Sequence, residues 1–180
     1  MKKIAFVFAF VFATVAAANA QNPMVGGAEM YPTKDIVDNA VNSKDHTTLV
    51  TALQAAGLVE TLKSAGPFTV FAPTNAAFDK LPEGTLSTLV KPENKATLTK
   101  ILTYHVVAGR LAATDIAKAI KKGKGKAMLK TVSGGTLTAS MDGEKVMLTD
   151  ENGGMAYVTQ ANVFQKNGVI HVIDGVVTPK

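Results

Sequence analysis

The hydrophobic period of this sequence changes near Lys126, and that change limits the folds open to the chain. From Thr33 to about Ile120, apolar side chains recur at the three- and four-residue spacing of one helix face. After Lys126 they alternate with polar side chains, which is typical of strands that bury one face. Helices that come first and strands that come later predict an α+β fold.

Turn residues indicate where the strands begin and end. A β-branched and aromatic run, Phe68–Ala72, lies between two prolines and is predicted to be a strand within the helical half. Thr136–Met141 and Glu144–Thr149 are predicted to form a hairpin, because Asp142-Gly143 supplies the positive φ angles of a tight turn. The remaining strands are predicted at Met155–Gln160 and Val169–Ile173.

Capping residues indicate the helices in the same way. Thr33, Asp45 and Thr114-Asp115 precede apolar runs with helical spacing and are predicted to cap them. Thr74-Asn75 offers caps for a short helix, and Gly57 is predicted to end a helix in the left-handed conformation.

Length and composition favour one domain with a core of its own. The chain has 180 residues, which is enough to bury a core without covalent or metal cross-links. It has no cysteine, which excludes a disulfide scaffold, a cysteine-ligated metal site and a thiol nucleophile. Charged residues make up only 18% of the chain, which argues against intrinsic disorder.

The first twenty residues have the layout of a secretory signal peptide. A short basic start, Met1-Lys2-Lys3, is followed by the apolar run Ile4–Ala18 and by the small residues of Ala18-Asn19-Ala20. The run is shorter than the roughly 20 apolar residues that span a bilayer. We therefore predict a signal peptide over residues 1–20, cleavage after Ala20, and a secreted or periplasmic protein. Residues 21–32 are predicted to be a flexible lead, and residues 33–180 the folded domain.

Positive charge is concentrated in one segment. Without Lys2 and Lys3, basic residues fall from 19 to 17 against 14 acidic ones, a net charge of +3. Six of the 17 lie close together, and without them 11 basic residues against 14 acidic ones leave −3. The six are Lys118, Lys121, Lys122, Lys124, Lys126 and Lys130.

This lysine segment has two interpretations. It is either an anchor for an acidic polysaccharide or an anionic lipid surface, or a solvated loop kept mobile by Gly123 and Gly125. A nucleic-acid partner is not expected, because the protein is secreted and the lysines lack interleaved aromatic residues for stacking. The candidate contacts are Lys121, Lys122, Lys124 and Lys126.

Motifs for catalysis or metal binding are not evident. No serine lies in a G-x-S-x-G motif, and His46, His105 and His171 lack the spacing of a zinc site. We expect these imidazoles to be partly buried and bonded to backbone, although His105 and His171 could meet in space. Asp150–Gly154 only faintly resembles a calcium loop. We therefore predict a protein that is not an enzyme, with no catalytic residue, metal or cofactor.

Three segments together resemble the fasciclin-type (FAS1) domain family. The first is GPFTVFAPTNAAF at Gly66–Phe78, the second YHVV at Tyr104–Val107, and the third GVIHVIDGVVTP at Gly168–Pro179. Their order and spacing agree with the family, and the resemblance covers about Tyr31 to Pro179. Small secreted single-domain bacterial members are the closer likeness.

The resemblance implies a fold and a function. The fold is a single α+β domain, a β-sandwich or wedge with helices packed over it. The function is adhesion without catalysis, through binding to a cell-surface or matrix protein or an acidic glycan. In animal relatives the Tyr-His region is implicated in integrin binding, which would correspond to Tyr104 and His105. Packing and hydrogen bonding are the competing role for these two residues.

Two other functions remain as alternatives. A periplasmic carrier of a small apolar ligand would need a cavity between the sheet and the helices. A hydrolase would use His105 or His171. We expect the protein to be a monomer.

Overall fold

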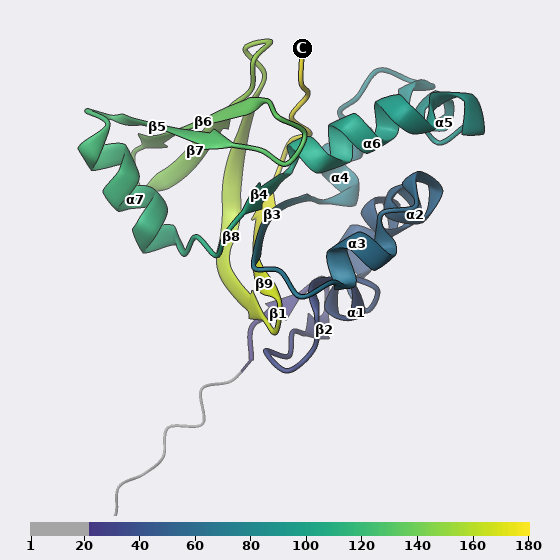
Figure 1. The fold of residues 1–180 in the computed structure, drawn as a ribbon, viewed down its shortest axis with the longest axis horizontal. Helices are drawn as coiled ribbons and strands as arrows, with labels where there is room; N and C mark the ends of the chain where they lie inside the picture. The colour runs from purple at the N-terminus through teal and green to yellow at the C-terminus, as the bar shows by residue number, and fades with distance from the viewer. Residues whose placement is uncertain (1–21) are drawn as a thin grey trace, which may run out of the picture.

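The strands of this computed structural model, which describes residues 22–180, form a two-stranded and a seven-stranded sheet (Figure 1). The strands are β1 (Met24–Val25), β2 (Ala28–Glu29), β3 (Phe68–Pro73), β4 (Val106–Ala108), β5 (Lys126–Lys130), β6 (Thr136–Asp142), β7 (Lys145–Thr149), β8 (Met155–Gln165) and β9 (Gly168–Ile173). The helices are α1 (Ile36–Ala40), α2 (Thr47–Ala56), α3 (Val59–Lys63), α4 (Asn75–Asp79), α5 (Thr85–Leu89), α6 (Lys95–Tyr104) and α7 (Ala113–Lys122), with 3-10 turns at Lys44–His46 and Pro92–Asn94.

The large sheet has the order β4-β3-β9-β8-β7-β6-β5 and curls on itself. Its neighbours are antiparallel except β3 and β9, which run parallel with Phe68 opposite Gly168 and Pro73 opposite Ile173. A single bridge between Val107 and Thr131 joins the two edges. The α+β prediction is confirmed, with one curled sheet as the wedge.

Two apolar clusters fill the two faces of the central strands. On one face, Val70 and Ile170 pack against α1, α2 and α6. On the other, Phe71 and Ile173 pack against the inner face of β5–β8 and against Ile116 of α7. Figure 1 shows the same division, with α1–α6 on one side of the central strands and α7 on the other. Strands β3 and β9 are therefore buried on both faces.

Some local predictions shift by one or two residues. The hairpin turn was predicted at Asp142-Gly143. Asp142 pairs with Lys145, so the two turn residues are Gly143 and Glu144. The first helix, α1, is capped by Asp35, whose carboxylate accepts from the Asp38 N–H, and not by Thr33. Capping by Thr74 and the left-handed Gly57, with φ of 72°, are as predicted.

Residues 22–32 pack against the domain, whereas the sequence predicted a flexible lead over residues 21–32. Strands β1 and β2 form a hairpin, and the side chains of Val25 and Met30 are buried in the helix-side cluster. The apolar residues of this segment are too sparse to show a period, so only their contacts with distant elements reveal their packing. The predicted signal peptide lies outside the described residues. Within residues 22–180, no helix has the length and apolar character to cross a membrane.

Asn167, in the turn between β8 and β9, joins three separate segments. Its Oδ1 atom accepts from the Ile36 N–H at 3.0 Å, where α1 begins. Its Nδ2 atom donates to the carbonyl oxygens of Leu62 at 2.7 Å and Ser64 at 2.9 Å, where α3 ends. The Asn167 side chain therefore holds two helix ends against the central strands.

Replacing Asn167 with alanine is expected to lower the free energy of unfolding by about 3 kcal/mol, because two buried backbone groups and the partly buried Ser64 carbonyl lose their partner. Asn152→Ala is the control, since Asn152 is exposed and its amide bonds only to the C-terminal segment. Urea denaturation of both variants measures the difference. Equal losses in the two variants would contradict the role of Asn167.

Candidate functional site

The Tyr104-His105 motif lies at the end of α6 and is buried. Tyr104 is 0% exposed, and its hydroxyl donates to the Thr136 carbonyl at 2.7 Å and accepts from the Glu151 N–H at 3.3 Å. Burial raises the pKa of Tyr104 to about 12. A Cβ atom on Gly135 would lie 2.7 Å from the Tyr104 ring, so this close approach requires glycine. Tyr104 thus ties α6 to the β5–β6 and β7–β8 connections.

His105 connects α6, β3 and the C-terminal segment. It is 2% exposed, its Nδ1 atom lies 2.9 Å from the Ile101 carbonyl oxygen, and its Nε2 atom accepts from the Val177 N–H at 3.2 Å. These bonds fix the proton on Nδ1. Its own carbonyl accepts from the Phe71 N–H at 2.9 Å. Burial lowers the pKa of His105 to about 4, so the ring is neutral near pH 7.

The burial of both side chains corrects one prediction. Tyr104 and His105 were candidates for direct partner contact, but in the folded protein neither presents a surface that a partner could reach. Their hydrogen bonds go to backbone groups of distant segments, which is the packing role.

The other two histidines are also buried, His46 beside a nearby serine and His171 beside the backbone of a distant segment. Ser43 Oγ lies 2.9 Å from His46 Nδ1, and His171 Nε2 lies 2.8 Å from the Leu111 carbonyl oxygen. The His171 ring stacks on Phe71, with centroids 5.6 Å apart. Burial lowers the pKa of both histidines. Within residues 22–180, no three His, Cys, Asp or Glu side chains are grouped so that they could hold a metal ion.

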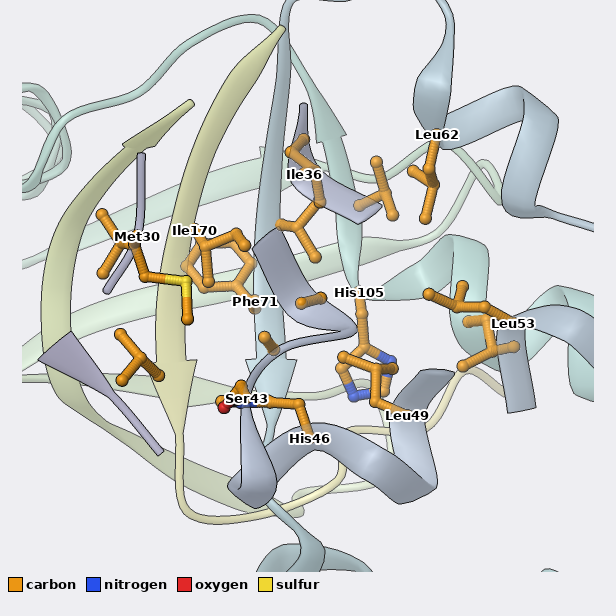
Figure 2. A pocket seen from close by; sticks show the side chains of 17 residues that line it. Met30, Ile36, Ser43, His46, Leu49, Leu53, Leu62, Phe71, His105 and Ile170 are labelled. Atoms are coloured by element: carbon orange, nitrogen blue, oxygen red, sulfur yellow. Dashed lines mark hydrogen bonds between the residues drawn. The ribbon is translucent and has the colours of Figure 1, made fainter. Parts of the chain in front are cut away.

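Two apolar cavities test whether the protein has room to carry a small apolar ligand. Figure 2 shows the first, which is lined by apolar side chains that include Ile170 on one side and Leu49 and Leu53 on the other, with His105 next to Leu49. Its volume is about 20 Å³, which is room for about one water molecule. The second lies among α4, α5 and α6 and measures about 150 Å³. Both are below the roughly 300–1,000 Å³ of common ligand sites.

The lysine segment is a helix, a turn and a strand, and not the mobile loop of the sequence interpretation. Gly125 N–H donates to the Ile120 carbonyl at 2.9 Å and ends α7, and Lys126 begins β5. All six lysine side chains are exposed, and none forms an ion pair with another described residue. We call this set the lysine surface: Lys118, Lys121 and Lys122 on α7, Lys124 in the turn, and Lys126 and Lys130 on β5.

The lysine surface borders an open hollow of about 470 Å³ between the end of α7 and β5. It is lined by Ala119, Lys122, Gly123, Lys126, Ala127 and Met128. Sequence reasoning missed Met128, whose side chain is 76% exposed on β5. The alternation of Lys126-Ala127-Met128-Leu129-Lys130 was the signal for it, because it places Met128 on the same face as two lysines.

Lys124 has a backbone conformation that is unusual for lysine. Its φ angle is 55°, in the left-handed region, and glycines flank it on both sides. For a residue with a Cβ atom this conformation costs on the order of 1–2 kcal/mol. The fold thus places a lysine at a position that favours glycine.

The burial of His105 predicts that acid destabilises the protein. The pKa is about 4 in the folded state against an ordinary 6.5, so the unfolded chain takes up the proton first as the pH falls. The stabilising contribution of neutral His105 is therefore complete above pH 6.5 and is lost between pH 6.5 and 4. We expect the free energy of unfolding to fall by about 2–3 kcal/mol across this range from His105 alone.

Urea denaturation at neutral pH and at about pH 4.5 measures this loss. The variant His105→Gln does not titrate, so its stability should change less between the two pH values than that of the wild-type protein. A wild-type stability that is the same at both pH values would contradict the prediction.

Known proteins resemble this chain over most of its length. The sequence model of the Fasciclin domain matches residues 44–179. Protein sll1483 of Synechocystis is 42% identical over 176 residues, which cover 96% of this chain and 91% of that protein. Immunogenic protein MPB70 of Mycobacterium bovis is 36% identical over 173 residues, covering 93% of this chain and 79% of that protein.

A solved structure has the same fold. It is a FAS1 domain pair from the insect cell adhesion molecule Fasciclin I, and it superposes with a TM-score of 0.71 at 17% sequence identity. The match covers 81% of this chain and 51% of the domain pair.

Proposed function

Since this chain belongs to the fasciclin domain family, as its three motifs predicted, we propose that it is a secreted, non-catalytic adhesion module. It binds a cell-surface or matrix partner that carries acidic groups, and it does so through the lysine surface. The observation that carries this proposal is the set of six exposed lysines on one helix, turn and strand, with no ion pair among the described residues.

Three further points support the proposal. A domain pair with this fold comes from a protein described as a cell adhesion molecule. Residues 1–20 have the layout of a signal peptide. The left-handed Lys124 lies at the tip of the lysine surface, and such strain is often found at functional positions.

Part of the lysine surface also has a structural role. Lys121 and Lys122 lie in the last turn of α7, where positive charge stabilises the helix dipole. That role does not extend to Lys124, Lys126 and Lys130, which lie beyond the helix. The carrier alternative has less support, because the two apolar cavities are small.

Replacing Lys121, Lys122, Lys124 and Lys126 with glutamine is expected to abolish binding to immobilised polyglutamate and dextran sulfate. These two polymers stand for an acidic protein and an acidic polysaccharide. For the wild-type protein, affinity should fall on the order of tenfold between about 50 and about 150 mM salt, because salt screens exposed charges.

A matched control removes the same charge elsewhere. Glutamine replaces four exposed lysines outside the lysine surface: Lys44, Lys91, Lys95 and Lys166. This variant should retain most of the binding. Equal binding by both variants, or no binding of the wild-type protein to either polymer, would overturn the proposed function.

A further inference from the structure

Strand β5 is an edge strand that the closure of the sheet leaves mostly open. On one side β5 pairs with β6 from Lys126 to Lys130. On the other side, Lys126 N–H donates to the Gly123 carbonyl at 3.4 Å, and β4 lies only beside the residues that follow β5. That contact consists of the bridge of Val107 to Thr131 and the bond from Val132 N–H to the Val106 carbonyl at 2.8 Å. The first part of β5, Lys126–Met128, borders the hollow next to α7.

The hydrogen-bond pattern shows which backbone groups point into that opening. Thr131 N–H donates to the Gly135 carbonyl at 2.9 Å, so Thr131 and Gly135 form a hydrogen-bonded pair. Bonded and non-bonded pairs alternate along an antiparallel ladder. Ala127 and Leu129 therefore bond to β6, and Met128 directs its N–H and C=O away from β6 toward the open edge.

The hollow at this edge suits an extended backbone. The hollow is open, and Ala119 on its α7 side is small, so another chain can come close to β5 at Met128. Gly123 itself packs against the Lys126 carbonyl, and the Ala127 side chain is buried on the inner face. Met128, at the centre of the edge, is largely exposed. An exposed strand edge with unpaired N–H and C=O groups is a template for a further strand.

The charges along the edge determine which strand fits. Lys126, Met128 and Lys130 share the outer face, and all three are exposed. Antiparallel pairing of two copies of β5 would bring lysines against lysines, and like charges opposite each other are destabilising. A strand with carboxylates on the same face would instead place them beside Lys126 and Lys130.

We propose that the open edge of β5 binds an extended acidic peptide segment by strand addition, with Met128 supplying backbone hydrogen bonds and Lys126 and Lys130 contacting the carboxylates. This inference rests on the proposed function, since it specifies the partner of the lysine surface. The lysines then have two effects, because they prevent self-pairing of the edge and favour an acidic strand.

The test uses the mature chain and a short blocked peptide of alternating glutamate and threonine. Two further peptides carry N-methyl groups, one on every glutamate and one on every threonine. In an added strand, alternate residues direct their N–H groups to opposite edges. Either the glutamates or the threonines therefore donate to β5, but not both. The lysines fix which face the glutamates occupy, so a one-residue shift cannot exchange the two sets.

We expect one methylated peptide to bind about tenfold more weakly than the parent, and the other to bind like the parent. Reversing charge at the edge with Lys126→Glu and Lys130→Glu should shift the preference to a lysine–threonine peptide. The same reversal at the exposed Lys91 and Lys95 is the control and should leave the glutamate peptide bound.

The outcomes separate this inference from the proposed function. If both methylated peptides bind like the parent, strand addition is wrong, and salt-dependent binding of the parent still supports the proposed function. If dextran sulfate binds and no peptide does, the inference of an acidic peptide partner is wrong. The proposed function then stands with an acidic polysaccharide as the partner. Failure of peptides, polyglutamate and dextran sulfate together overturns both.

Discussion

The parallel pairing of β3 with β9 is the contact on which the rest of this structure depends. The two strands are far apart in the sequence, with Phe68 paired to Gly168, and both are buried on both faces. One face holds the cluster shared with α1, α2 and α6, and the other holds the cluster shared with α7 and the remaining strands. A change in their register would therefore disturb both clusters at once.

This arrangement explains why the motifs that identify the family are poor candidates for contact with a partner. The first and third motifs contain β3 and β9, and the Tyr104-His105 motif joins α6 to β3 and to the C-terminal segment. These residues have buried partners on the backbone, so they maintain the fold. Recognition of a partner has to use the surface, and there the distinctive feature is a concentration of unpaired lysines.

The lysine surface and the open edge of β5 have a common origin in the topology. The chain leaves β4, forms α7, and returns as β5 at the opposite edge of the same sheet. Closure through one bridge leaves most of the β5 edge unpaired. An unpaired edge invites aggregation, and lysines on it are a common protection. The same lysines are the basis of the preference for acidic segments that we propose for this edge.

The sequence by itself determined the α+β class, strands β3 and β9 and the left-handed Gly57. These follow from side-chain period and backbone preference, which are properties of neighbouring residues. Only the tertiary structure decided the packing of the N-terminal segment, the three bonds of Asn167, the burial of Tyr104 and the open edge beside Met128. Each depends on contacts between residues far apart in the chain, whose pairing is set by register and by closure of the sheet.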